Sequence, residues 1–370
     1  MAHLPQARNF SGTFPLDEPG RCGPSQRLLL RFLLGILCGL WLVSPAAAAQ
    51  DSVKQLGGSI SGKVVEMSPT HVTVQQGEKT RPIETRDIVE VLYDGEPVEL
   101  TTSRFSIASG HYRKAKAALK KLDLAALEGY IREDVEFYLA LCEARLALEG
   151  AASISTAGSA LYKFDREHKN SYHHFAACEV MGDLLLAAQK YAQAIKSYET
   201  LAGAPWDEYR MKAGVLVSRV LQAQGKHREA LARLNEVEKL ASTAQSEQAH
   251  RQALYARLGR AVSLGAQGQT SQAIELVQQV LADAPPHESE LHARAYNTLG
   301  GCYLLLNQDK EALLAFLHVD LLYQASPDLH AEALHHLATL WEKLGKKDRA
   351  KQASVTLHDR YSTSRWAKTH

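Results

Sequence analysis

Residues 296–316 have the sequence YNTLGGCYLLLNQDKEALLAF, in which two adjacent glycines interrupt a run of helix-forming residues. A glycine inside a helix costs about 1 kcal/mol relative to alanine, so Gly300 and Gly301 need a structural reason. A backbone without a side chain permits the close approach of either a ligand or a second helix. Which of these two neighbours is present decides whether the stretch belongs to an enzyme site or to an array of packed helices.

The chain from Ser103 to Thr369 is rich in Ala, Leu, Glu, Gln and Lys and repeats one helical pattern. Apolar residues recur at i, i+3, i+4 and i+7, as in amphipathic helices that pack on a core. A small residue, followed by large apolar residues four and seven positions later, recurs at intervals of 36 to 43 residues. These anchor residues are Ala115, Ala157, Ala194, Ala230, Ala273, Ala312 and Ala350. A recurrence of this length predicts stacked helical hairpins.

The opening stretch resembles the tetratricopeptide repeat, with the pattern W-x2-L-G-x2-Y on a first helix and A-x3-F on a second. The matching residues are Tyr296, Leu299, Gly300, Tyr303, Ala312 and Phe316. The units around Ala194 and Ala350 match in the same register. The resemblance implies a mainly α fold, an α-solenoid of about seven hairpins over residues 103–369. A separate pattern before it, at residues 59–100, predicts a small β-barrel-like segment.

This register gives the two glycines different roles. Gly300 is expected to fit against Ala312, so that two helices approach closely, while Tyr303 fills the space between hairpins. Gly301 falls on the opposite side, where the missing side chain would leave room for the backbone of a partner. Cys302 becomes a small buried hydrophobe rather than a nucleophile.

A different period governs residues 59–100, where short β-branched runs alternate with turn residues. The runs SISGKVVEM, HVTVQQ, RPIET and IVEVLYDGEPVEL predict four or five strands. Their pattern resembles small SH3-like or Sm-like barrels. We expect residues 50–58 to be a linker, since they are rich in glycine and precede the first run.

The N-terminal region contains RLLLRFLLGILCGLWLVSPAAAAQ over residues 27–50, which has the order of a secretory signal peptide. Basic residues precede a short apolar core, and an alanine run supplies the cleavage region. We therefore expect a signal peptide at 27–49 after a disordered leader extension at 1–26, with export to the periplasm or cell envelope. The alternative is an uncleaved segment, residues 28–49, that anchors the chain to the inner membrane.

Composition excludes several classes of function. Lys plus Arg number 42 and Asp plus Glu 41, which gives a net charge of +1. This balance lacks the excess of basic residues that is typical of nucleic-acid-binding proteins. Cys142, Cys178 and Cys302 are widely spaced without a CxxC motif, so we expect buried hydrophobes rather than a disulfide framework or a zinc site.

The 16 histidines include two adjacent pairs, His173–His174 and His335–His336. Neighbouring residues on a helix point about 100° apart, so each pair is a poor chelate. No phosphate-cradling glycine motif and no nucleophile motif occurs in the chain. The sequence therefore predicts no enzyme, no metal and no cofactor.

A binding surface remains as the functional candidate. The tetratricopeptide resemblance implies that first helices line a concave groove that holds protein or peptide partners. The candidate groove residues are Glu179, Asp183, Arg219, Arg294, Asn297, Gly301, His335 and Glu342. Their mixed charges indicate a partner that is not strongly charged, or a groove with separate acidic and basic ends.

Two functions fit these patterns. The first is a non-enzymatic cell-envelope scaffold or adaptor that binds a protein or peptide in the groove. The second is a structural component that assembles into oligomers through its β segment. Membrane association through the N-terminal apolar segment is compatible with either function.

Overall fold

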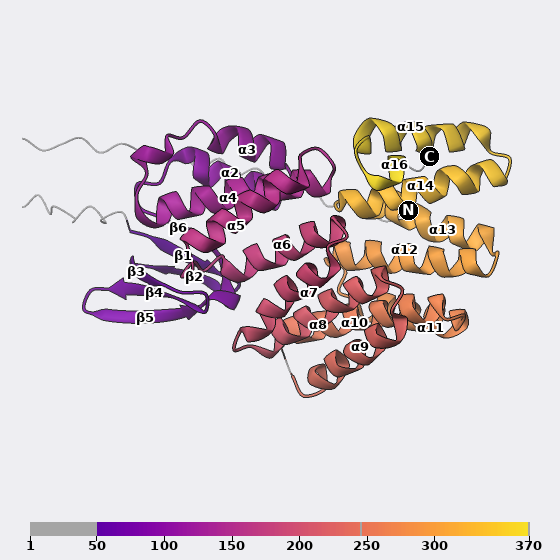
Figure 1. Cartoon of the computed structure of the whole chain (residues 1–370), viewed down its shortest axis with the longest axis horizontal. Helices are drawn as coiled ribbons and strands as arrows, with labels where there is room; N and C mark the ends of the chain where they lie inside the picture. The colour runs from indigo at the N-terminus through magenta and orange to yellow at the C-terminus, as the bar shows by residue number, and fades with distance from the viewer. Residues whose placement is uncertain (1–49, 245, 369–370) are drawn as a thin grey trace, which may run out of the picture. The chain divides into compact units, whose positions relative to one another are not determined.

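A computed structural model describes residues 50–244 and 246–368 (Figure 1). The expected leader extension at 1–26 and the signal peptide or anchor at 27–49 lie outside these described residues. Gln50–His370 form one unit. No helix in the described part of the chain is both long and apolar enough to span a membrane.

Six strands form the β segment, in two antiparallel three-stranded sheets. The strands are β1 (Ser52–Gln55), β2 (Gly58–Ser61), β3 (Lys63–Met67), β4 (His71–Gln76), β5 (Lys79–Glu84) and β6 (Ile88–Leu92). The strand orders are β2-β1-β6 and β3-β4-β5. Val53, Val72, Val74 and Val91 are fully buried between the sheets and their neighbours, because alternate residues of a strand point to one face.

The boundaries expected for this segment require two corrections. Residues 50–58, expected as a linker, contain strand β1 and the start of β2, with Leu56 and Gly57 in the turn between them. At the other end, Val98 to Leu100 were expected in a strand but begin a helix. Pro97 immediately precedes that helix, where its missing N–H costs no hydrogen bond, and Glu99 favours the positive end of the helix dipole.

Helices make up the rest of the described chain. The α-helices are α2 (Val98–Ala108), α3 (Tyr112–Leu119), α4 (Gly129–Leu148), α5 (Ile154–Glu167), α6 (His174–Ala187), α7 (Tyr191–Glu199), α8 (Asp207–Ala223), α9 (His227–Ala241), α10 (Glu247–Ala266), α11 (Thr270–Asp283), α12 (Ser289–Leu305), α13 (Asp309–Leu322), α14 (Pro327–Lys343), α15 (Lys347–Tyr361) and α16 (Arg365–Lys368). The short 3-10 helices are η2 (Thr85–Asp87), η3 (Leu124–Ala126) and η4 (Thr200–Gly203).

Helices α2 to α15 pair into successive hairpins that stack along the chain, as the solenoid prediction requires (Figure 1). Each anchor alanine lies on the second helix of a hairpin, from Ala115 on α3 to Ala350 on α15. Six of the seven anchors are completely buried or nearly so, and Ala350 is half-buried. The α-solenoid of tetratricopeptide-like hairpins is confirmed.

A left-handed residue ends the first helix of every hairpin. These residues are Gly110, Gly150, Gln189, Gly225, Gly268, Asn307 and Gly345. At Asn307 the amide donates to the carbonyl of Leu304, and the next amide donates to the carbonyl of Tyr303. This is the Schellman arrangement, which satisfies the last carbonyls of a helix. It turns the chain sharply enough for the second helix to fold back on the first.

The nearest neighbour of the opening glycine is the aromatic ring of Phe316, and the expected contact with Ala312 stays a prediction. A Cβ atom added to Gly300 would lie 2.6 Å from the Phe316 ring. Gly182 has the same relation to Tyr198, with 2.3 Å to the ring. In both hairpins the first helix must therefore carry glycine, because the ring from the second helix occupies the space of a side chain.

Buried charges connect the β segment to the first hairpins. The Arg104 guanidinium donates to Asp134 at 2.8 Å and to Glu96 at 2.6 Å, and all three side chains are almost inaccessible to water. His173 contacts the second Asp134 oxygen at 2.9 Å, and the Tyr93 hydroxyl donates to the same oxygen at 3.4 Å. Removing one partner from such a network leaves a buried charge unpaired, so the segment that follows β6 is held firmly against α4.

The two adjacent glycines provide a matched test of the packing. We expect Gly300→Ala to lower the free energy of unfolding by about 1–3 kcal/mol, because the new methyl group overlaps the Phe316 ring. Gly301→Ala should leave stability unchanged or raise it by up to about 1 kcal/mol, because in the described chain no atom beyond its neighbours and its own helix backbone lies within 4 Å of its Cβ position. Urea unfolding followed by circular dichroism measures both. Equal effects of the two substitutions would contradict the assignment of Gly300 to the helix contact.

Candidate ligand-binding groove

Charged side chains from the first helices of several hairpins gather on one surface. We call this surface the inner face and define it by Asp183 on α6, Arg219 on α8, Glu290 and Arg294 on α12, and Asp328 on α14. Burial alone would lower the pKa of Arg219, but the Asp183, Glu290 and Asp328 carboxylates raise it above its usual value. Groups on four different helices are thus close enough to act on one another.

Arg219 differs from the other cations of the inner face. In the described part of the chain, no hydrogen bond or ion pair engages its guanidinium. Its surface is partly accessible, although protein surrounds it at longer range. An arginine presents five N–H donors in a planar fork. Arg219 therefore offers donors, held within reach of several carboxylates, that a bound anion or amide could use.

The other charges of the inner face have partners. Arg294 donates to Glu290 at 2.9 Å, one turn earlier on α12. Burial would raise the pKa of Glu290, yet Arg294, Arg219 and Arg251 together hold it below the usual value. Asp183 accepts from the Tyr198 hydroxyl at 2.7 Å and lies 3.6 Å from Arg145. These pairings fix the carboxylates in place.

Asn297 belongs to the helix packing rather than to an open surface. It is almost fully buried, and its amide donates to the Leu329 carbonyl at 2.9 Å and to Glu332 at 3.0 Å. Its own carbonyl oxygen is buried without a partner. Burial, and then the Asp328 carboxylate, raise the pKa of Glu332 to about 7. Asn297 therefore holds α14 against α12 at the border of the inner face.

The remaining groove candidates are dispersed. Glu179 pairs with Lys212 on the next first helix. Gly301 faces open space, in agreement with the room expected there. His335 packs beside Trp366, with ring centroids 5.3 Å apart, and Glu342 is exposed near the end of α14. The structure thus brings Asp183, Arg219 and Arg294 together and leaves the other candidates at the margins.

Several charged residues of this region were not singled out from the sequence. They are Arg145, Arg251, Glu290, Asp328, Glu332 and Arg365. Some of them could have been found from their spacing. Glu290 and Arg294 are four residues apart, as are Asp328 and Glu332, so the members of each pair share a helix face. The contribution of Arg365 had no such signal, because it comes from the last short helix.

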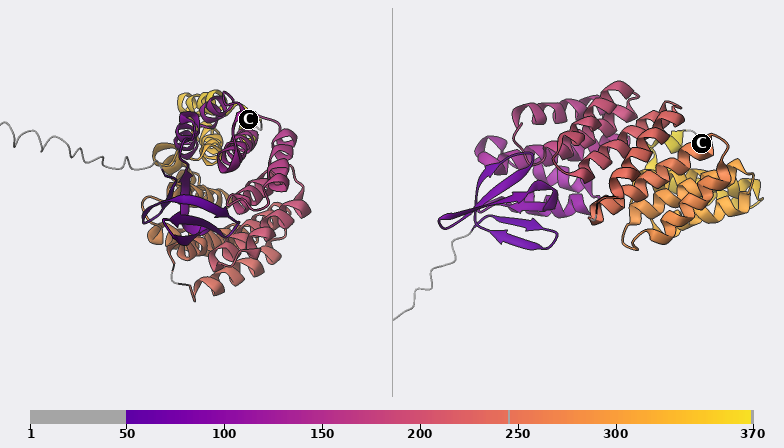
Figure 2. Two further views of the ribbon diagram at one scale, coloured as in Figure 1. Left: turned by 90° about the vertical axis from the view of Figure 1, so that its left-hand side faces the viewer. Right: turned by 90° about the horizontal axis from the view of Figure 1, so that it is seen from below.

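The second hairpin (α4–α5) touches the end of the array, although 214 residues separate the contact (Figure 2). The Thr363 hydroxyl, in the turn between α15 and α16, donates to the Glu149 carbonyl at 2.5 Å. A Cβ atom on Gly150 would lie 2.2 Å from the Thr363 carbonyl oxygen. The α4–α5 turn therefore closes against the end of the array, and the inner face lies within a closed path of helices.

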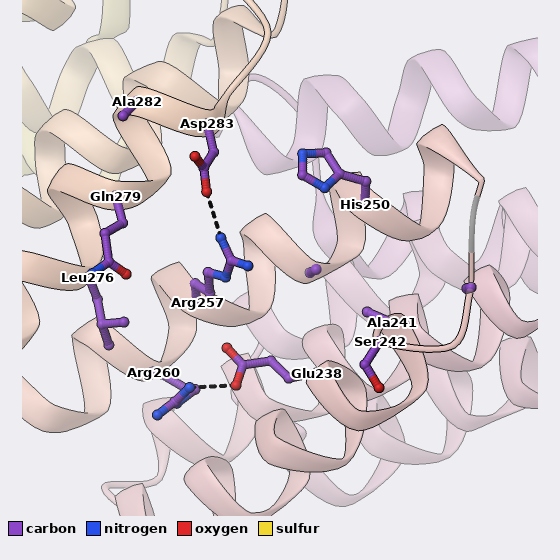
Figure 3. Close-up of a pocket in the computed structure, with 12 residues that line it drawn as sticks. Glu238, Ala241, Ser242, His250, Arg257, Arg260, Leu276, Gln279, Ala282 and Asp283 are labelled. Atoms are coloured by element: carbon purple, nitrogen blue, oxygen red, sulfur yellow. Dashed lines mark hydrogen bonds and ion pairs between the residues drawn. The ribbon is translucent and has the colours of Figure 1, made fainter.

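A cavity of about 670 Å³ lies elsewhere, lined by α9, α10 and α11 (Figure 3). Its arginines already have partners: Arg257 donates to Asp283 at 2.8 Å, and Arg260 pairs with Glu238. It includes none of the candidate groove residues. We favour the inner face as the ligand site, because no carboxylate is paired directly with Arg219 in the described part of the chain, whereas both arginines of this cavity have such a partner.

Comparison with known proteins finds solved structures that share part of this fold at low sequence identity. No family model matches the sequence, and no curated protein matches it. A tetratricopeptide repeat protein from Parabacteroides merdae ATCC 43184 is 13% identical, with a TM-score of 0.48 over 73% of this chain and 96% of that chain. A Rap protein complexed with Competence and Sporulation Factor is 17% identical, with a TM-score of 0.48 over 74% and 77%.

PilW, a type IV pilus biogenesis factor, is 15% identical, with a TM-score of 0.40 over 64% of this chain and 97% of that chain. The tetratricopeptide-like class rests on this chain's own hairpins and on its glycine and alanine contacts.

Two turn glycines with the same backbone conformation test the closing contact. Gly150 and Gly225 have φ of 77° and 73°, so alanine strains both equally. Only Gly150 faces another segment, so Gly150→Ala should cost about 1–3 kcal/mol more than Gly225→Ala. Urea unfolding measures the difference, and hydrogen exchange should rise in residues 362–364 of the first variant alone. Matching losses in the two variants, with unchanged exchange, would rule out the contact.

Proposed function

We propose that this protein is a non-enzymatic scaffold that binds an extended segment of a protein or peptide partner on its inner face. The observation that carries the proposal is Arg219, a guanidinium without a direct partner among surrounding carboxylates. A buried cation is stabilised when a ligand supplies charge-assisted hydrogen bonds. A peptide carboxylate or a row of backbone carbonyls is the complementary chemistry.

The partner's charge pattern follows from the neighbours of Arg219. Asp183, Glu290 and Asp328 would repel a lone anion. A ligand with an amine or guanidinium next to a carboxylate would complement both charges: its carboxylate would pair with Arg219, and its cation with the surrounding carboxylates. We therefore favour a zwitterionic stretch of peptide over a small inorganic anion.

Export to the periplasm or cell envelope is part of the proposal. It is supported by the order of basic, apolar and small residues at 27–49. The inner face would then meet partners outside the cytoplasm, and a retained segment at 28–49 would tether the same groove to the inner membrane.

A peptide array tests the groove. The array carries extended peptides in which the positions of acidic and basic residues vary, and bound sequences are then measured by fluorescence polarisation with the full chain. We expect Arg219→Gln to weaken binding about 10- to 100-fold, because a hydrogen bond to a charged group is worth about 1.5–3 kcal/mol.

Glu342→Gln is the matched control, since this exposed carboxylate lies near the end of α14 away from Arg219. It should bind the selected peptides within about twofold of the wild type, as expected for a surface charge. Equal affinities of the Arg219 variant and the wild type for every selected peptide would exclude the inner face as the site.

Processing of the N-terminus tests export. We expect the protein recovered from the envelope fraction to begin near Gln50, because cleavage follows the alanine run. Edman sequencing or mass spectrometry of the intact chain measures this directly. An N-terminus upstream of residue 28 on membrane-bound protein would instead support the anchor.

A further inference from the structure

Helices α5 and α6 bring together three side chains that the groove does not use. His174 and Cys178 are four residues apart on α6, and the Cys178 sulfur lies 3.9 Å from His174 Nε2. The other ring nitrogen, Nδ1, lies 2.7 Å from Asp165 Oδ1 at the end of α5. One ligand atom from each residue lies within 4.8 Å of the other two.

This arrangement departs from the sequence-based expectation for both residues. The adjacent pair His173–His174 is indeed no chelate, because His173 points inward to Asp134 while His174 meets Asp165. The partner of His174 is instead Cys178, one turn further along the same helix face. Cys178 is about nine-tenths buried, as expected, but its sulfur faces an imidazole rather than only apolar atoms.

We propose that this cluster is a binding site for a zinc-like divalent transition-metal ion, with Cys178 Sγ and His174 Nε2 as direct ligands and Asp165 as the residue that orients the imidazole. Thiolate and imidazole suit zinc and related ions, whereas calcium and magnesium prefer oxygen ligands. Water completes the coordination, since the His174 and Asp165 side chains keep contact with solvent.

The distance between the two ligand atoms fits one shared ion. Zinc binds sulfur at about 2.3 Å and imidazole nitrogen at about 2.0–2.1 Å, so tetrahedral geometry places the two ligand atoms roughly 3.6 Å apart. The separation here is 3.9 Å. A small rotation of either side chain closes the difference, and both already lie on the same face of a rigid helix.

Asp165 selects the required form of the imidazole. A carboxylate that accepts from Nδ1–H leaves Nε2 free to donate its lone pair to a metal, as in carboxylate–histidine–metal sites. The same hydrogen bond, followed by the contact with Cys178, raises the pKa of His174 to about 10. Because this shift favours the protonated ring, an ion that binds here must displace a proton from Nε2.

A second cluster, Glu136, Glu167 and His168, is a weaker candidate. His168 already has two carboxylate neighbours, at 2.7 Å from Glu136 and 3.5 Å from Glu133. It contains no sulfur, so its spectrum with a metal would differ from that of the Cys178 cluster. This difference lets one experiment separate the two.

Titration of the full-length chain with cobalt(II) chloride tests the site. Cobalt(II) replaces zinc in such sites, and a cysteine ligand gives a near-ultraviolet thiolate-to-cobalt charge-transfer band. We expect this band in the wild type, its loss in Cys178→Ser and His174→Asn, and its displacement by zinc chloride. Asp165→Asn should keep the band and weaken binding about 10- to 100-fold.

Cys302→Ala is the matched control, because Cys302 is a buried thiol on α12 outside the cluster, and the band should persist in it. Circular dichroism confirms that each variant is folded. No charge-transfer band in the folded wild type, or a band that survives in Cys178→Ser, would overturn the proposal. So would cobalt binding that disappears in His168→Asn but persists in Cys178→Ser.

Discussion

The close contact between a bare helix backbone and an aromatic ring sets the geometry on which the array depends. Phe316 fills the space where Gly300 lacks a side chain, and the same ring stacks on His336 of the next hairpin at 4.5 Å. One side chain therefore fixes both the distance within a hairpin and the distance to its neighbour. Because each hairpin buries its apolar face only against the next, an error in this spacing would pass along the stack.

Much of this fold could be predicted from the sequence, because the contacts involved are local and periodic. The anchor alanines lie on second helices as expected, and Gly300 is a helix contact. Phe316 was not predicted as its nearest neighbour, since a period cannot tell which side chain of the second helix comes closest. The left-handed residues that end the first helices were not predicted. A glycine usually lies five residues before the anchor alanine, but Gln189 and Asn307 take its place in two hairpins and so hide the pattern.

The candidate site was predictable only in part. Helical period places Asp183, Arg219 and Arg294 on first helices, but their meeting depends on the rotation accumulated over several hairpins. The contact of Glu149 with Thr363 depends on the whole array in the same way. Asn297 shows a different limit of sequence reasoning. It was predicted to line the groove, but its amide donates to the Leu329 carbonyl and to Glu332, so it is packed between helices and not on the open surface.

The closed path of helices and the mixed charges of the inner face constrain a ligand together. Carboxylates already paired to Arg145 and Arg294 retain part of their negative potential. An anion that reaches Arg219 must therefore overcome repulsion from three directions. A peptide reduces this cost with its own cations and neutral amides, whereas inorganic phosphate has neither. In the function proposed here, the groove would select by the order of charges along a chain rather than by total charge.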